Sequence, residues 1–181
     1  MLNRIETGLT KIGLGLALAM LACSLSPAQE VSTNSMPGTD FSKYHTYKWV
    51  PIEGAVQPNQ IVDAQIKQSV DAQLGTKGLT MTDGEKADLL VGYQISVDQE
   101  KQWNAYSTGG LRWGGGMASA QQSTISTGTL VLDMYDPVSK QLVWTGRVSK
   151  TIDASANQGK KQKNLDKAMQ KLLKSYPPKQ T

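Results

Sequence analysis

Three stretches in the second half of the chain alternate between apolar and polar side chains, and this alternation constrains the fold more than any other feature. They cover residues 89–98, 129–135 and 142–153. A period of two residues is typical of a β-strand that buries one face. The apolar positions are Leu89, Val91, Tyr93, Ile95, Val97, Leu130, Leu132, Met134, Leu142, Trp144, Val148 and Ile152. The sequence therefore predicts three long strands.

The connection between the second and third stretches is short and rich in turn-forming residues. It consists of residues 136–140, with the sequence Asp-Pro-Val-Ser-Lys. A parallel pair of strands needs a crossover of roughly a dozen residues or more, whereas a tight turn is enough for an antiparallel pair. We therefore expect residues 129–153 to form an antiparallel hairpin.

Two segments carry the pattern of amphipathic helices. Apolar side chains recur every four residues after Asn59, which is the expected N-cap, and Gly75 or Gly78 is the expected end. The second helix has one apolar and one lysine-rich face and ends at Pro177-Pro178. Its apolar face consists of Leu165, Ala168, Met169, Leu172, Leu173 and Tyr176.

Strand composition at residues 45–50 and a short run at 79–82 complete the order of elements. Helices at both ends of a run of antiparallel strands are typical of an α+β layer. The expected fold is an antiparallel sheet of about four strands with two helices packed on one face, in the order β-α-(β)-β-β-β-α.

The N-terminal segment has the features of an export signal. Arg4 and Lys11 give it a positive start, and residues 12–25 contain no charged side chain. This apolar run is too short for a transmembrane helix, which needs roughly 20 residues. It does match the apolar region of a secretory signal peptide, which is about 7–15 residues long. We expect no transmembrane helix in the mature chain.

The single Cys, Cys23, lies near the end of this apolar run and follows the small residue Ala22. This context resembles a bacterial lipoprotein signal, which implies cleavage before Cys23 and a diacylglycerol on its sulfur, with acyl chains such as palmitate. Because Ser24 and not Asp follows, the resemblance also implies an outer-membrane lipoprotein that faces the periplasm. Alternatively, an ordinary signal peptidase would cut after Ala28 and release a soluble periplasmic protein.

These features divide the chain into three parts: a signal peptide at 1–22, a flexible tether at 23–39 and a single α+β domain at 40–178. The tether is expected because residues 24–39 are rich in Ser, Thr and Pro. Such a segment has too few large apolar side chains to offset the cost of ordering.

The composition leaves few groups for catalysis. One Cys and one His, His45, exclude an internal disulfide framework and the usual His/Cys zinc site. No Ser lies in a Gly-x-Ser-x-Gly context. A pair of carboxylates could act as in glycosidases, but Asp83, Glu85 and Asp88 lie in a Gly-containing turn. We therefore expect no enzyme, no catalytic, cofactor-binding or metal-binding residues, and a structural role for His45.

Two surface features allow either a structural or a binding interpretation. The Gly-rich segment 107–119 is either a plain loop between strands or a tip that contacts lipid or an envelope protein through Leu111, Arg112 and Trp113. The lysines at 160, 163, 167, 171 and 174 are either a solvated helix face or a surface for phosphate-bearing lipid or an acidic partner. A formal net charge of +4 gives little support for nucleic-acid binding, and export argues against it.

Several blocks of the sequence, in order, are similar to one family. They lie at residues 40–49, 87–91, 128–136, 142–146 and 171–178. They resemble the domain-of-unknown-function family numbered 4136, which is found in lipoproteins of Gram-negative bacteria. The resemblance implies an exported, lipid-anchored α+β domain and supplies no catalytic residues.

The expected function is a non-enzymatic, lipid-anchored module of the cell envelope that binds or stabilises another component. The expected partners are the membrane, through the N-terminal lipid, and an envelope protein. The alternative is a periplasmic carrier that holds a small apolar or lipid ligand between its sheet and its helices.

Overall fold

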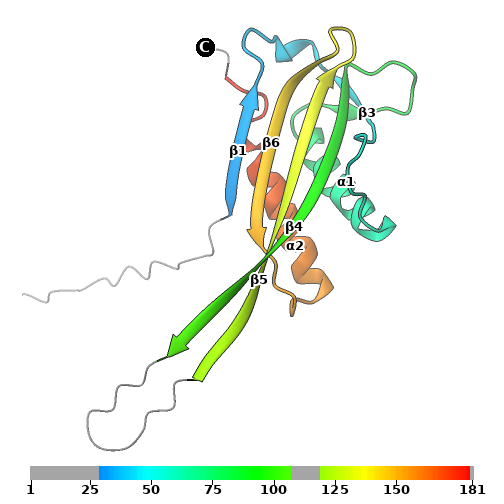
Figure 1. Ribbon diagram of the computed structural model, residues 1–181. Helices are drawn as coiled ribbons and strands as arrows, with labels where there is room; N and C mark the ends of the chain where they lie inside the picture. Colours follow the sequence, from blue (N-terminus) through cyan, green and yellow to red (C-terminus); the bar gives the residue numbers. More distant parts are fainter. Residues whose placement is uncertain (1–28, 107–118, 180–181) are drawn as a thin grey trace, which may run out of the picture.

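The computed structural model describes residues 29–106 and 119–179, which form one mixed sheet with two helices on one of its faces (Figure 1). The six strands lie in the order β1-β6-β5-β4-β2-β3. The strands are β1 (Glu30–Ser35), β2 (Thr46–Trp49), β3 (Thr80–Met81), β4 (Leu89–Tyr106), β5 (Ser119–Asp136) and β6 (Gln141–Thr151). The helices are α1 (Gln60–Gly75) and α2 (Gln158–Leu172), with short 3-10 turns η1 (Phe41–Lys43) and η2 (Leu173–Ser175).

The predicted alternating strands are β4, β5 and β6, and the expected hairpin is the antiparallel pair of β5 and β6. Their apolar side chains line up in rows across the sheet, beneath the helices. The rows are Val91, Met134 and Trp144; Tyr93, Leu132 and Gly146; and Ile95, Leu130 and Val148. Period-two patterning thus placed the buried face correctly, since Leu89, Val91, Leu132 and Met134 are fully buried.

The expected all-antiparallel sheet of about four strands is wrong, because the sheet is mixed and has six strands. β2 pairs in parallel with both β3 and β4. The chain leaves β2, passes through α1 and returns to the same sheet, and such a crossover places the returning strand parallel to the first. The α+β class itself is confirmed.

The expected tether does not extend over its whole length. Residues Glu30–Ser35, within the segment 23–39, form the edge strand β1, which pairs antiparallel with β6 from Ser149 to Trp144. The strand is polar and mostly exposed, so backbone hydrogen bonds hold it in place, and Val31 is its one side chain packed against the core. Its sequence therefore carries almost no alternation from which a strand could be predicted.

Both helices begin at an Asn cap. The Asn59 side chain accepts a hydrogen bond from the Val62 backbone N–H over 3.0 Å, and Asn157 accepts one from Lys160 over 2.9 Å. The two helices are joined through Ser69 Oγ, which donates to Asp166 Oδ1 over 2.7 Å. No helix in the described part of the chain is long and apolar enough to cross a membrane.

The two ends of the sheet differ. At the end near the β5–β6 turn, hereafter the turn end, aromatic rings fill the space between sheet and helices: Tyr176 packs edge-on against Phe41 and Trp144, each at 5.7 Å. At the opposite end, hereafter the arm end, β4 and β5 continue beyond β6 as a two-stranded arm whose pairing reaches Tyr106 and Ser119 (Figure 1).

Candidate functional site

A groove of about 290 Å³ opens between the two helices and the sheet at the arm end. We call it the end groove. Its lining is almost entirely apolar and comes from α1, α2 and the three central strands. The apolar lining residues are Val62, Ile66, Ile95, Val97, Leu130, Val148, Ile152, Ala156, Leu165, Ala168 and Met169. This volume is close to the lower limit of about 300 Å³ for pockets that hold small molecules.

The groove exists because small residues lie between the sheet and the helices at the arm end, whereas aromatic rings fill the corresponding space at the turn end. Gly128, Ala156 and Ala168 come from β5, the segment before α2 and α2 itself, and all three line the hollow. A Cβ atom on Gly128 would lie 3.1 Å from Ile152 Cδ1, so the absence of this side chain keeps the floor open. Because these three residues have small side chains or none, part of the sheet surface at the arm end stays uncovered.

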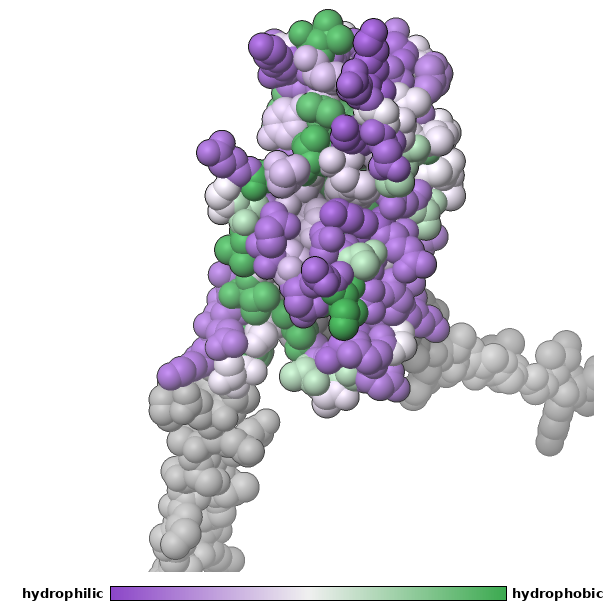
Figure 2. Space-filling view, turned by 90° about the vertical axis from the view of Figure 1, so that its right-hand side faces the viewer, coloured by the Kyte–Doolittle hydropathy of each residue, from purple (hydrophilic) through white to green (hydrophobic). Residues whose placement is uncertain are grey.

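The mouth of the end groove exposes apolar surface. Val97 on β4 is 56% exposed, and Ile152, directly after β6, is 42% exposed. Figure 2 shows green apolar patches low on this side of the body, close to the base of the β4–β5 arm. Exposed apolar groups around a concave site are typical of a surface that contacts another molecule.

Charged groups at the mouth are mainly basic. Lys150, which is half-buried, and Lys161 both line the groove. Burial, followed by the charges of Lys167, Lys171 and Lys160, lowers the pKa of the Lys150 ammonium. Asp153 is the one carboxylate in the lining, and it accepts from Lys160 Nζ over 2.8 Å, which helps to hold its pKa at about 2.

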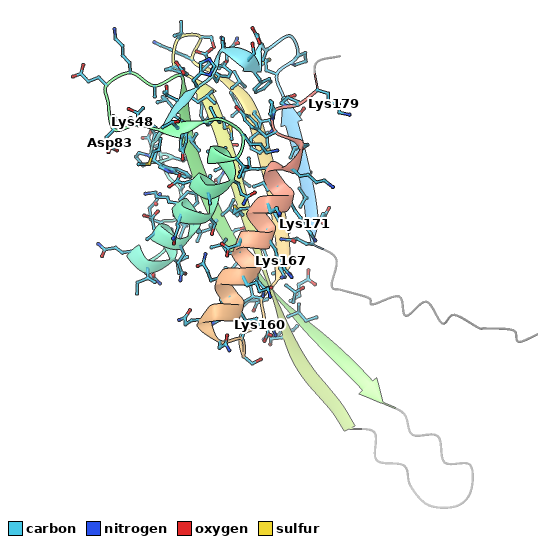
Figure 3. The ribbon with its side chains drawn as sticks, turned by 180° about the vertical axis from the view of Figure 1, so that it is seen from behind. Lys48, Asp83, Lys160, Lys167, Lys171 and Lys179 are labelled. Carbon is cyan, nitrogen blue, oxygen red and sulfur yellow. The ribbon has the colours of Figure 1, made fainter. Side chains whose placement is uncertain are left out.

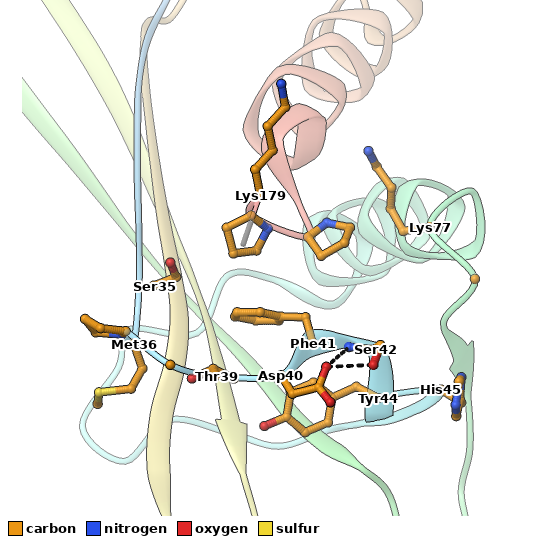
Figure 4. A pocket seen from close by; sticks show the side chains of 15 residues that line it. Ser35, Met36, Thr39, Asp40, Phe41, Ser42, Tyr44, His45, Lys77 and Lys179 are labelled. Atoms are coloured by element: carbon orange, nitrogen blue, oxygen red, sulfur yellow. Dashed lines mark hydrogen bonds between the residues drawn. The ribbon is translucent and has the colours of Figure 1, made fainter. Parts of the chain in front are cut away.

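A second hollow, of about 940 Å³, lies at the turn end and has a rim of both polar and apolar side chains (Figure 4). The loop after β1, η1 and the segment Pro177–Lys179 surround it. The Asp40 carboxylate accepts from both the backbone N–H and the hydroxyl of Ser42, at 2.9 and 2.6 Å. Turns and short loops build this hollow, so it offers less apolar contact than the end groove.

The single imidazole lies at the rim of the second hollow. His45 is exposed and stands directly before β2 (Figure 4). Its backbone N–H donates to Asp88 Oδ2 over 2.9 Å, and Thr46 donates to the same oxygen through its backbone and its hydroxyl. These bonds lower the pKa of Asp88 and tie the start of β2 to the start of β4.

Several other carboxylates also bind hydroxyl or indole donors. Asp71 Oδ1 on α1 accepts from Tyr47 Oη over 2.6 Å and from Trp49 Nε1 over 2.9 Å. Asp63 Oδ1, two turns earlier, accepts from Tyr93 Oη over 2.6 Å. Within the residues that the structure describes, no three His, Cys, Asp or Glu side chains could hold a metal ion. Four of the hollows there contain at most one carboxylate each.

The site residues that the sequence predicted fall outside the described ranges. These are Cys23, the expected lipid attachment site, and the expected contact residues Leu111, Arg112 and Trp113. A ligand held between the sheet and the helices was the alternative that the sequence analysis offered, but the residues that line the end groove were missed, because small residues from three separate elements form it. The only signal for it in the sequence was the lysine-rich face of α2, part of which lies beside the mouth.

Comparisons with known proteins agree with this fold. A family model described as a domain of unknown function (DUF4136) matches residues 31–178. No curated protein matches the sequence. A PDZ domain protein from Parabacteroides distasonis has a similar structure, with a TM-score of 0.56 and 15% identity over 84% of this chain. The matched region is only 37% of that protein's length.

Two other solved structures match less closely. PelC from Paraburkholderia phytofirmans, solved as a dodecamer, has a TM-score of 0.49 and 9% identity over 81% of this chain and 95% of its own. A neuraminyllactose-binding hemagglutinin homolog from Helicobacter pylori has a TM-score of 0.40 and 13% identity over 75% of this chain and 87% of its own.

Proposed function

This chain belongs to the domain-of-unknown-function family DUF4136, and from that premise we propose that it is a non-enzymatic binding module of the cell envelope whose binding site is the end groove. The bound group is an apolar chain, which the module holds between its sheet and its helices. This is the function that the geometry of the described residues supports best.

One observation carries the proposal: an apolar hollow opens to solvent between two helices and a sheet whose opposite end is filled by aromatic rings. Leaving such a surface in water costs roughly 25 cal/mol for each Å² of apolar area. An apolar chain that enters the groove recovers this free energy. The hollow is open at the mouth and is not an enclosed cavity, so a ligand can enter without unfolding the core.

The proposal includes the expected location. We propose that Cys23 carries the lipid, that the protein is anchored in the outer membrane and that its domain faces the periplasm. The chain between Cys23 and the start of β1 at Glu30 is short, so the anchored domain would remain close to the bilayer. Cleavage after Ala28, which would give a soluble periplasmic form, is the alternative.

The absence of enzymatic activity is also a proposal. It is supported by how the described carboxylates are used, since Asp63, Asp71, Asp88 and Asp136 each accept hydrogen bonds that join elements of the fold. A glycosidase-type site would instead need two carboxylates that face each other across a cleft.

The proposal is tested by photolabelling in membranes. Envelopes that contain the full protein are incubated with dodecanol that carries a diazirine in its chain, then irradiated, and the labelled peptides are identified by mass spectrometry. We expect the label on peptides that contain Val148 to Ile152 and Leu165 to Met169, which line the end groove. Labelling spread evenly over the surface would contradict the proposal.

A matched pair of variants sharpens this test. Ile152→Asp places a charge at the mouth, where the native side chain is partly exposed, and should remove most of the labelling. Val138→Asp changes a 91% exposed residue in the turn after β5 and should label like the wild type. Equal labelling of the two variants would contradict the end groove as the binding site.

A second candidate function is contact with an envelope protein through the β4–β5 arm. The arm favours it because two paired strands that project beyond a sheet are marginally stable in water alone. Under this proposal Leu111, Arg112 and Trp113 are the contact residues. Crosslinking in intact envelopes should then capture a partner that is lost in Trp113→Ala.

A further inference from the structure

The most distinctive charge in the end groove is the ammonium group of Lys150. Its side chain lies on the helix-facing side of β6, two residues after Val148, and it is half-buried against an apolar lining. Lys161, from the first turns of α2, lines the same groove from the other side. A cation that is partly removed from water needs a compensating negative charge.

Nearby charges increase that need. Lys160, Lys167 and Lys171 follow one side of α2 (Figure 3), and all three repel the Lys150 ammonium. Their spacing of seven and four residues places them on one helix face, which is why the repulsion adds up. An anion at the mouth of the groove would therefore be attracted by several lysine side chains, which outnumber the carboxylates there.

The acids of this region already have other partners. Asp153 forms an ion pair with Lys160 at 2.8 Å. Asp166 Oδ1 accepts from Ser69 Oγ and from Gln162 Nε2, at 2.7 and 2.9 Å. Among the described residues, three ion pairs are found, and none of them includes Lys150 or Lys161.

We propose that the end groove binds an anionic amphiphile, whose apolar chain enters the groove while its phosphate or carboxylate headgroup lies between Lys150 and Lys161. This inference rests on the proposed function and adds the class of ligand to it. A headgroup at this position relieves the repulsion around Lys150 at the same time as the chain covers Val97 and Ile152. Neither a neutral chain nor a free anion gains both contributions.

The test uses three competitors that have the same chain and different headgroups. The full protein in phosphatidylcholine vesicles is labelled with the diazirine dodecanol, and labelling is displaced with dodecyl phosphate, dodecanol or dodecyltrimethylammonium. We expect dodecyl phosphate to compete at a roughly tenfold lower concentration than dodecanol, and dodecyltrimethylammonium to compete least. Inorganic phosphate alone should not displace the label, and displacement at the same concentration would overturn the amphiphile as the ligand.

The three competitors can partition unequally into the bilayer. A comparison of variants removes this effect, because wild type and variants are measured with the same competitors in the same vesicles. Lys150→Gln with Lys161→Gln should abolish the advantage of dodecyl phosphate over dodecanol. Lys174→Gln, an exposed lysine in η2 and outside the groove lining, is the control and should retain that advantage. The competition in the wild type separates the headgroup inference from the proposed function.

If dodecanol and dodecyl phosphate compete equally in the wild type, the headgroup inference is wrong while apolar binding remains. If no dodecyl compound competes, the proposed function fails together with the inference. Retention of the phosphate advantage in the double Gln variant would show that Lys150 and Lys161 do not hold the headgroup.

Discussion

The phenol of Tyr44 donates a hydrogen bond to the buried carboxylate of Asp136 over 3.0 Å and so connects the segment before β2 to the end of β5. Lys43 Nζ contacts the same oxygen at 2.9 Å. The other oxygen of Asp136 accepts from the backbone N–H groups of Val138 and Ser139, which shape the β5–β6 turn. One carboxylate thus joins a turn and a distant 3-10 segment.

We expect Asp136→Asn to lower the free energy of unfolding by about 2 kcal/mol at neutral pH. The amide oxygen can still accept from the turn, but the NH2 group that replaces the second oxygen can accept from neither Lys43 nor Tyr44. The Lys43 contact, together with the turn N–H groups and Tyr44, holds the pKa of Asp136 well below its usual range. Urea unfolding measures the change, and Asp98→Asn, at an exposed position on β4, is the control.

The effect of Asp136→Asn should depend on pH. A carboxyl group with a lowered folded-state pKa stabilises the fold above its unfolded pKa of about 3.9, and this stabilisation is lost as the pH falls from there through the folded value. The difference between wild type and variant should therefore be constant near neutral pH and shrink below about pH 4. A difference of the same size at pH 3 would mean that the ionised carboxylate is not its source.

Gly146 occupies a position where the fold leaves no room for a side chain. It lies in the middle row of the sheet, and a Cβ atom there would collide with the Trp144 ring and lie 2.8 Å from Leu172 Cδ1. Gly146→Ala should therefore lower the free energy of unfolding by about 1–3 kcal/mol through overpacking. The measurement is thermal or urea unfolding of the full protein.

The control for Gly146→Ala is Gly159→Ala in the first turn of α2. A Cβ atom there would have its nearest contact at 3.7 Å, and Ala is the better helix former, so we expect no loss of stability. A similar loss in both variants would argue against the packing explanation.

Asp71 connects α1 to the aromatic residues of β2. Replacing it with Ala leaves the Tyr47 hydroxyl and the Trp49 indole N–H without their acceptor. Tyr47 is 1% exposed, so water cannot easily replace the carboxylate at the phenol ring. We expect a loss of about 2–3 kcal/mol in urea unfolding, whereas Asp83→Ala in the exposed loop after β3 should change little.

The sequence predicted those elements whose stability comes from their own pattern. Alternation from Leu89 to Tyr93 and around Leu132 identified the buried face, whereas Val97, on the same face of β4, is 56% exposed; Asn59 marked the true start of α1. β1 has no such pattern, because pairing with β6 holds it and its side chains are mostly exposed. The parallel pairing of β2 depends on where α1 returns the chain, which composition does not encode.

The candidate site was harder to predict for a similar reason. A lysine-rich face on α2 was visible in the sequence, but Lys150 belongs to β6 and joins those lysines only in the folded protein. Likewise, Gly128 and Ala168 are unremarkable small residues until the sheet and α2 bring them to the same hollow. A site whose residues come from several elements can be recognised only when the tertiary structure shows which residues lie together.

Cys23 provides the test of the proposed anchor. Cys23→Ala should abolish incorporation of labelled palmitate in growing cells, since no other thiol exists in the chain. The wild type should fractionate with the outer membrane and begin at Cys23 in its mature form. Ser24→Ala keeps the thiol and serves as the control, with normal labelling expected. A wild-type protein that takes up no label and begins at Gln29 would instead establish the soluble periplasmic form.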